Sequence, residues 1–257
     1  MTVLQGPPII ALMAGHSHWA NIQRTKGAAD AKKAKLFAKL ARAIQVAAKE
    51  GGGNPGMNLR LATAVEDAKA ASVPRDTIER SIKKGTGEIE GVTYEQVTYE
   101  GYASGGVAVM VEALTDNKNR TAADMRRIFE NAGGNVGGTG CVAFLFQRKG
   151  VLSIPVAAAG EDQMMNDVLE SGAENMETDG DHYVVTAAVA DFENVKKALG
   201  KKYKIENADV TLIPKDYLNV DEEIGRKVLT LLDHLDDNED VQKFYSNADI
   251  PESALKS

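Results

Sequence analysis

The chain has 257 residues, of which 43% are hydrophobic and 26% are charged, and this ordinary composition argues against wholesale disorder. A single cysteine excludes an internal disulfide and favours a reducing compartment, so we expect a cytoplasmic protein. No apolar run reaches the roughly 18 residues that span a bilayer, so we expect no membrane partner. The formal net charge is −7, but the charges are unevenly distributed along the chain.

Residues 1–12 contain no charged side chain and include a Pro-Pro pair. They lack the positive segment and the cleavage site of a signal peptide, and they lack the arginines of a mitochondrial presequence. We therefore predict a disordered extension that precedes a functional start at Met13.

The segment after this extension is strongly basic. Between Met13 and Lys49 the sequence has eight Lys or Arg and one acid, which gives a net charge of +7. A helix is predicted over residues 27–50, because Phe37, Leu40 and Ile44 recur at helical spacing and form one apolar arc. On the opposite side of this helix lie the residues that we call the basic stripe: Lys32, Lys35, Lys39 and Arg42.

Two further helices complete a basic helical domain, which we predict for residues 13–90. They are expected at about residues 57–71 and from Pro74 to just before Gly85, with short glycine-rich connections. The remaining residues, 91–257, hold 16 Lys and Arg against 29 Asp and Glu. Because an acidic region repels phosphate at long range, we expect the two regions to have different partners.

The sequence after Gly91 alternates apolar and polar residues and predicts strands joined by short turns. Thr121 is expected to be the N-cap of a helix, and a strand is expected at Cys141. From Val151 to Pro214 the predicted order is β-α-β-β-α-β, which is a ferredoxin-like unit. The segments on either side are each incomplete and are expected to fold together. The predicted fold class is α+β with three domains: the helical domain, a discontinuous α+β domain of residues 91–149 and 217–257, and an inserted ferredoxin-like domain of residues 150–216.

Several stretches resemble ligand-binding or catalytic motifs, but the residues around each of them do not fit such a site. The glycine-rich stretch of residues 133–140 follows a predicted helix and opens a strand, which is the reverse of a phosphate-binding loop. The acidic run of residues 236–240 begins like a calcium loop but lacks its glycine and its closing glutamate. The four histidines and Cys141 form no recognisable metal or nucleophile pattern. We therefore predict no catalytic residue, no metal and no cofactor, and we do not expect an enzyme.

The basic stripe is the best candidate for a functional surface. Solvated helical faces usually mix Glu with Lys, whereas no acid occurs between Lys32 and Lys49. Unopposed like charges favour a polyanion partner, and an aromatic side chain in the preceding arm is suited to stacking on a base. Because the stripe lies opposite the apolar arc, we expect that reversing its charge spares the core and costs little stability. The predicted nucleic-acid-binding residues are Trp19, Arg24, Lys26, Lys32, Lys33, Lys35, Lys39 and Arg42.

Several stretches resemble the YebC/PmpR family. They include MAGHSHWANIQ at residues 13–23, GGGNPGMNLRLATAV at 51–65 and GGNVGGTGCVAFLFQRKG at 133–150. The resemblance extends from Met13 to the C-terminus and implies a helical N-terminal domain followed by two α+β domains. The sequence departs from the family's more basic pattern in the arm before the first helix, at His18, Gln23 and Thr25.

The resemblance implies a non-enzymatic, nucleic-acid-binding regulator of gene expression. Bacterial members of the family are described as DNA-binding transcriptional regulators. Relatives act in translation, among them the mitochondrial translational activator of cytochrome oxidase subunit I and ribosome-associated factors that relieve stalling. The expected partner is therefore DNA, or ribosomal RNA on the ribosome, with the acidic domains reaching protein partners. Phosphate recognition is common to both targets, so the sequence leaves this choice open.

Overall fold

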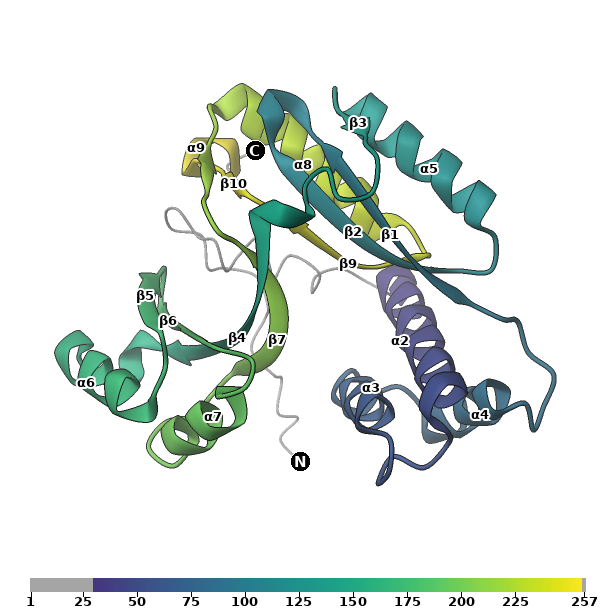
Figure 1. Ribbon diagram of the computed structural model, residues 1–257, viewed down its shortest axis with the longest axis horizontal. Helices are drawn as coiled ribbons and strands as arrows, with labels where there is room; N and C mark the ends of the chain where they lie inside the picture. Colours follow the sequence, from purple (N-terminus) through teal and green to yellow (C-terminus); the bar gives the residue numbers. More distant parts are fainter. Residues whose placement is uncertain (1–29, 256–257) are drawn as a thin grey trace, which may run out of the picture.

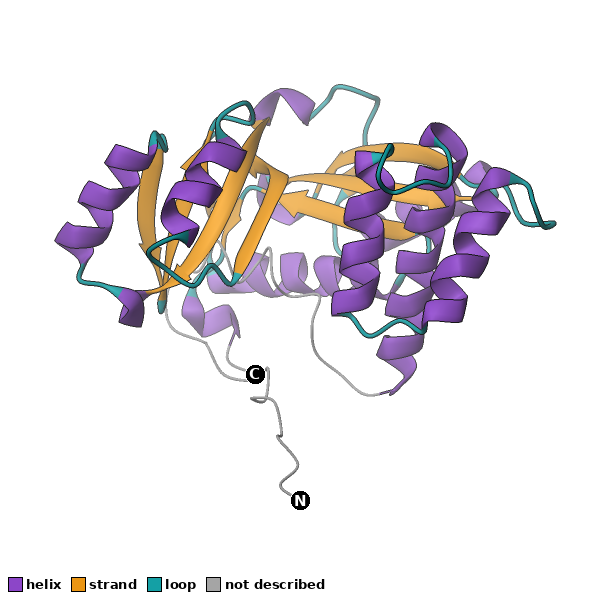
Figure 2. Ribbon diagram, turned by 90° about the horizontal axis from the view of Figure 1, so that it is seen from below, coloured by secondary structure: helices purple, strands orange, loops and turns teal. Residues whose placement is uncertain are grey.

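A computed structural model describes residues 30–255 of the chain (Figure 1). The predicted extension of residues 1–12 lies outside these residues. The described chain begins with helices and continues into two four-stranded sheets, which Figure 2 shows as separate blocks lying next to each other. None of the described helices combines the length and the apolar character that crossing a membrane requires.

Three helices form the N-terminal part: α2 (Asp30–Gly51), α3 (Leu59–Ala70) and α4 (Arg75–Thr86). α2 lies between the other two and shares with them a core that includes Ile44, Leu61 and Ile78. Gly85 allows the closest approach, because a Cβ at this position would lie 2.3 Å from the carbonyl oxygen of Gln45. A small side chain is therefore required where α4 crosses α2.

The first sheet has the strand order β3-β1-β2-β9 and is antiparallel throughout. Its strands are β1 (Glu95–Tyr102), β2 (Ala108–Thr115), β3 (Asn135–Val136) and β9 (Val241–Ser246). Helices α5 (Lys118–Asn131) and α8 (Glu222–Asp237) pack on one face, where Val109 and Val111 of β2 meet Phe129 and Leu231. Residues 217–255 add a short parallel pair and a final helix: β8 (Leu218–Asn219), β10 (Ala248–Asp249) and α9 (Glu252–Leu255).

The second sheet has the order β5-β6-β4-β7 and is also antiparallel. Its elements follow one another as β4 (Phe146–Pro155), α6 (Glu161–Ser171), β5 (Asn175–Asp179), β6 (His182–Ala187), α7 (Phe192–Gly200) and β7 (Asn207–Pro214). This is the ferredoxin-like arrangement that the sequence predicts. Because β9 returns to pair with β2 after this unit, the unit is an insertion. The predicted α+β class with an inserted domain is confirmed, whereas the residue boundaries of the domains stay a prediction.

The two sheets share a second apolar core. The side chains of β2 alternate, so that Val109 and Val111 face α5 and α8 while Ala108 and Met110 face Phe146 at the start of β4. This is why the sequence of β2 is a nearly continuous apolar run rather than an alternating one. The inserted domain is therefore packed on the first sheet and not merely tethered to it.

Two local expectations are wrong. Asn117, not Thr121, is the N-cap of α5, since its side chain accepts a hydrogen bond from Arg120 N at 3.1 Å. Thr121 lies inside the helix and is fully buried. Cys141 lies in a turn rather than a strand, and a 3-10 helix at Ala143–Leu145 separates it from β4. Burial and the charge of Glu100 raise the pKa of the Cys141 thiol.

The glycine-rich stretch of residues 133–140 leads into a loop that encloses a carboxylate of the chain itself. The buried side chain of Glu100 accepts hydrogen bonds from the backbone N–H groups of Gly140, Val142 and Ala143 at 2.7, 2.9 and 2.8 Å. Burial raises the pKa of Glu100, but these three donors outweigh it, and the pKa lies below its ordinary value. The loop therefore binds a carboxylate of the chain itself, and its backbone donors at Gly140, Val142 and Ala143 are occupied.

Replacing Glu100 by Gln should lower the free energy of unfolding at neutral pH by about 1–3 kcal/mol, because the amide keeps one acceptor oxygen and turns the other into an NH2 group that faces a buried N–H donor. The native pKa is lower than the unfolded one, so this stabilisation is complete above the unfolded value of about 4.3 and is lost as the pH falls through the native value. Urea unfolding across this range should show a flatter acid dependence for the variant. The exposed Glu130→Gln serves as control, and an acid dependence that is equal in the Glu100 variant and the wild type would contradict the assignment.

Candidate nucleic-acid interface

Helix α2, which carries the basic stripe, lies between two neighbours. Its apolar side packs on α3 and α4. Its other side meets the last two residues of α8 and the turn that leads to β9, residues 236–240, which we call the acidic turn (Figure 1). α2 thus joins the helical domain to the elements of the first sheet.

Two lysines of the stripe contact the start of the acidic turn. Lys35 Nζ lies 3.2 Å from Asp237 Oδ1 and 3.3 Å from the Asp237 backbone oxygen. Lys39 Nζ donates to the backbone oxygen of Asp236 at 2.7 Å and lies 3.6 Å from its carboxylate. Both ammonium groups are therefore neutralised within the chain.

Arg42, one helical turn further, makes the most extensive contact. Its Nη1 lies 3.2 Å from Asp240 Oδ1, its Nη2 lies 3.2 Å from Glu239 Oε2, and Nη1 also donates to the Glu239 backbone oxygen. The guanidinium lies 5.4 Å from the ring centroid of Tyr94, within the range of a cation–π contact. The planar fork of arginine suits two carboxylates at once, which a lysine does not.

The expectation that the charges of the stripe are unopposed and lie on the open surface is wrong at its centre. The side chains of Lys39 and Arg42 are only 13% and 15% exposed. Burial lowers the pKa of Lys39, and the neighbouring Asp236 opposes that shift. The reason is distance in sequence: the acids that cover the stripe come from the other end of the chain, about 200 residues away.

Asp240 is the centre of this contact. Its carboxylate is 6% exposed, and it accepts hydrogen bonds from Arg120 Nη2 at 2.8 Å and from Thr121 Oγ1 at 2.7 Å, in addition to Arg42. Thr121 Oγ1 also lies 2.7 Å from Thr115 Oγ1. The hydrogen bond to Asp240 and a second one to Asp116 raise the pKa of Arg120. One buried carboxylate therefore binds α2, α5 and β9 together.

The other predicted nucleic-acid-binding residues are only partly placed. Trp19, Arg24 and Lys26 lie outside the described residues, and of Lys32 only its place in α2 is described. Lys33 is exposed, with its ammonium 5.7 Å from the ring centroid of Phe37. The structure thus brings Lys35, Lys39 and Arg42 together, but they contact the acidic turn of the same chain.

A second group of cations, which the sequence analysis did not select, remains open to solvent. Arg80, Lys83 and Lys84 are exposed on α4, and none of them forms an ion pair with another described residue. Their i, i+3, i+4 spacing places them on one face of the helix. The spacing is visible in the sequence, but the acids at Asp76 and Glu79 dilute its local charge. By contrast, three of the four cations of α5 are paired, Lys118 with Glu95, Arg120 with Asp116 and Arg127 with Asp124, while the exposed Arg126 forms no ion pair with another described residue.

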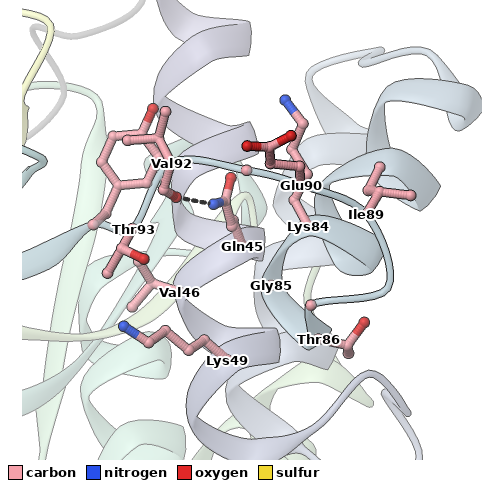
Figure 3. Close-up of a pocket in the computed structure, with 13 residues that line it drawn as sticks. Gln45, Val46, Lys49, Lys84, Gly85, Thr86, Ile89, Glu90, Val92 and Thr93 are labelled. Atoms are coloured by element: carbon pink, nitrogen blue, oxygen red, sulfur yellow. Dashed lines mark hydrogen bonds between the residues drawn. The ribbon is translucent and has the colours of Figure 1, made fainter.

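A groove with a volume of about 370 Å³ lies between α2, the end of α4 and the segment that leads to β1 (Figure 3). Lys49 and Lys84 border it from the two helices, and Glu90 lines it as well. Gln45 Nε2 donates to the backbone oxygen of Val92 and fixes the linker over α2. The segment that leads to β1 is thus held on α2 at this point.

The geometry defines a three-domain α+β protein with an exposed cationic face on a small helical domain. Within the described residues, no three His, Cys, Asp or Glu side chains gather as a metal site would require. Family models match almost the whole chain: "TACO1/YebC protein N-terminal domain" over residues 17–88 and "TACO1/YebC second and third domain" over residues 94–248.

The chain belongs to the TACO1/YebC family. A "Probable transcriptional regulatory protein" of Dictyoglomus turgidum is 52% identical over 247 residues, which cover 95% of this chain and 99% of the relative. A protein of the same name from Rubrobacter xylanophilus is 50% identical over 245 residues, covering 95% and 98%. The crystal structure of the conserved hypothetical protein Aq1575 from Aquifex aeolicus is similar, with 44% identity and a TM-score of 0.81 over 94% of this chain and all of that one.

Replacing Asp240 by Asn should lower the free energy of unfolding by about 3–5 kcal/mol, because two arginines then face a buried amide in place of a carboxylate. The matched Asp237→Asn variant removes a half-exposed carboxylate from the same turn and should cost less than about 1 kcal/mol. Urea denaturation of the two variants measures the difference. Equal small losses would show that Asp240 does not hold α2 in place.

Proposed function

We propose that this protein is a non-enzymatic regulator of gene expression that binds nucleic acid through its helical domain. The observation that carries the proposal is the open cationic face of Arg80, Lys83 and Lys84 on α4, which lacks partners among the described residues. It lies on a domain whose residues 30–86 have twelve Lys or Arg and six acids, whereas residues 91–257 are strongly acidic. Polyanions are therefore attracted to one end of the molecule and repelled from the rest. The names of the relatives support a regulatory role.

Only part of the basic stripe is available for binding in this proposal. Lys35, Lys39 and Arg42 bind phosphate only when the acidic turn moves away from them, since carboxylates occupy their donors. Trp19, Arg24, Lys26, Lys32 and Lys33 stay predicted contacts. The face of α4 is thus the proposed primary contact, and the start of α2 extends it.

The composition of α4 also favours a second candidate. The helix has no Asn or Gln, and its exposed lysine and arginine side chains can contact phosphates without reading the base sequence. Backbone recognition of this kind serves structured RNA as well as duplex DNA. A translation factor that docks on ribosomal RNA is therefore the alternative, and it is separated from a transcriptional regulator by comparing ribosome cosedimentation with promoter-DNA binding at equal ionic strength.

Reversing three charges in Arg80→Glu, Lys83→Glu and Lys84→Glu should weaken binding to duplex DNA. It should make the slope of log affinity against log salt shallower by about 2–3 units, because a variant that no longer neutralises these phosphates releases fewer counterions on binding. Affinity is measured by fluorescence anisotropy over a range of salt concentrations, with folding checked by circular dichroism.

The matched control reverses three cations of the inserted domain, Arg148, Lys197 and Lys201, which are exposed and form no ion pair with another described residue. It changes the net charge equally, so a difference between the two variants reports on where the charges lie and not on their sum. An equal loss of affinity in the two triple variants, or an unchanged salt slope in the α4 variant, would show that α4 is not a contact surface.

A further inference from the structure

The end of the connection between α2 and α3 and the first residue of α3 carry two apolar side chains that point into solvent. Met57 is 85% exposed and Leu59 is 83% exposed, more than any other large apolar side chain in the described part of the chain. They flank Asn58, which is buried. We call Met57 and Leu59 the apolar tip.

The loop that carries the tip is firmly anchored. Asn58 Nδ2 donates to the backbone oxygens of Ala47 and Gly52 at 2.8 and 2.9 Å, and Asn58 Oδ1 caps α3 by accepting from Leu61 N at 3.1 Å. A Cβ at Gly51 would lie 2.6 Å from the Asn58 side chain, so glycine is needed for this contact. The tip is therefore exposed because hydrogen bonds hold the loop in this conformation, and not because the loop is loosely packed.

The same loop is packed against the helix that carries the open cations. A Cβ at Gly53 would lie 2.8 Å from Thr86 Cγ2 and 3.1 Å from Ile82 Cγ2, so the loop touches the last turns of α4. Lys83 and Lys84 come from those turns. Arg60 directly follows Leu59, and it pairs with Glu50 and donates to Gln96 Oε1 at 3.0 Å. The tip and the cationic face are parts of one rigid unit.

We propose that Met57 and Leu59 contact unstacked nucleobases of a nucleic acid whose phosphates are held by the cations of α4. This inference rests on the proposed function, and it adds the part of the ligand that the tip recognises. Apolar wedges, Met and Leu among them, insert between base steps in proteins that bind and open nucleic acids. Phosphate contacts at α4 and base contacts at the tip together select single-stranded or locally opened strands over a closed duplex.

The size of the tip favours bases over a protein partner. A stable protein interface buries roughly 800 Å² on each partner, far more than two side chains provide. A base, in contrast, is covered by one or two side chains. The positive charge of the helical domain adds a complementary attraction for the backbone that carries those bases.

The test uses the full chain and short single-stranded oligonucleotides, compared with abasic strands of the same length and backbone. The wild type should bind the base-bearing strand about tenfold tighter than the abasic strand, since covering the tip removes apolar surface from water. The M57A/L59A variant should bind both strands with the affinity that the wild type has for the abasic one. With a 2-aminopurine base in the strand, the wild type should change its fluorescence and the variant should not.

The matched control is M165A/L169A, which truncates an exposed Met–Leu pair at i, i+4 on α6 of the acidic inserted domain. It should leave both affinities unchanged. Wild-type binding that does not distinguish the two strands, or an equal loss on both strands in M57A/L59A, would overturn the tip as a base contact while leaving the proposed function intact. If the wild type binds none of the four ligands (the two single strands, duplex DNA and ribosomal RNA), the proposed function itself fails. The tip proposal then fails with it.

Discussion

A single buried carboxylate, that of Asp240, determines how the helical domain sits on the rest of the molecule. Taking a charged group out of water is costly unless several donors replace the water, and here Arg42, Arg120 and Thr121 do so from two different helices. Because Arg42 is the donor that comes from α2, the ion pair also fixes the helical domain. The orientation of the three helices relative to the first sheet therefore depends on residues that are far apart in sequence.

This contact determines which of the basic side chains are free to bind a partner. The sequence separates a basic region from an acidic one, and the structure shows that the two partly neutralise each other where Lys35 and Lys39 meet Asp237 and Asp236. The centre of the basic stripe, which looks free in the sequence, is thus paired within the chain. The cations that remain open belong to a different helix, α4.

Much of the fold is predictable from the sequence, since it depends on local periodicity. The three helices of the N-terminal domain and the order of the ferredoxin-like unit follow from the spacing of apolar residues and from glycine positions. The N-cap of α5 is harder to predict because Asn117 and Thr121 are both good capping residues, and only the buried hydroxyl network of Thr121 decides between them. The environment of the stripe is not predictable, because its partners lie about 200 residues away and no local pattern encodes them.

The two sides of α2 make different types of contact, and this difference bears on function. Its contact with α3 and α4 is an apolar core, which salt does not weaken, whereas its contact with the acidic turn is ionic and half-exposed at Lys35 and Asp237. The helical domain is therefore internally firmer than its attachment to the first sheet. Any displacement of α2 from the acidic turn would move the α4 cations and the apolar tip as one body, because Gly53 and Gly85 hold the loop and α4 in close contact with their neighbours. The same displacement would expose Lys39 and Arg42, so that the cationic surface grows in the direction of the stripe.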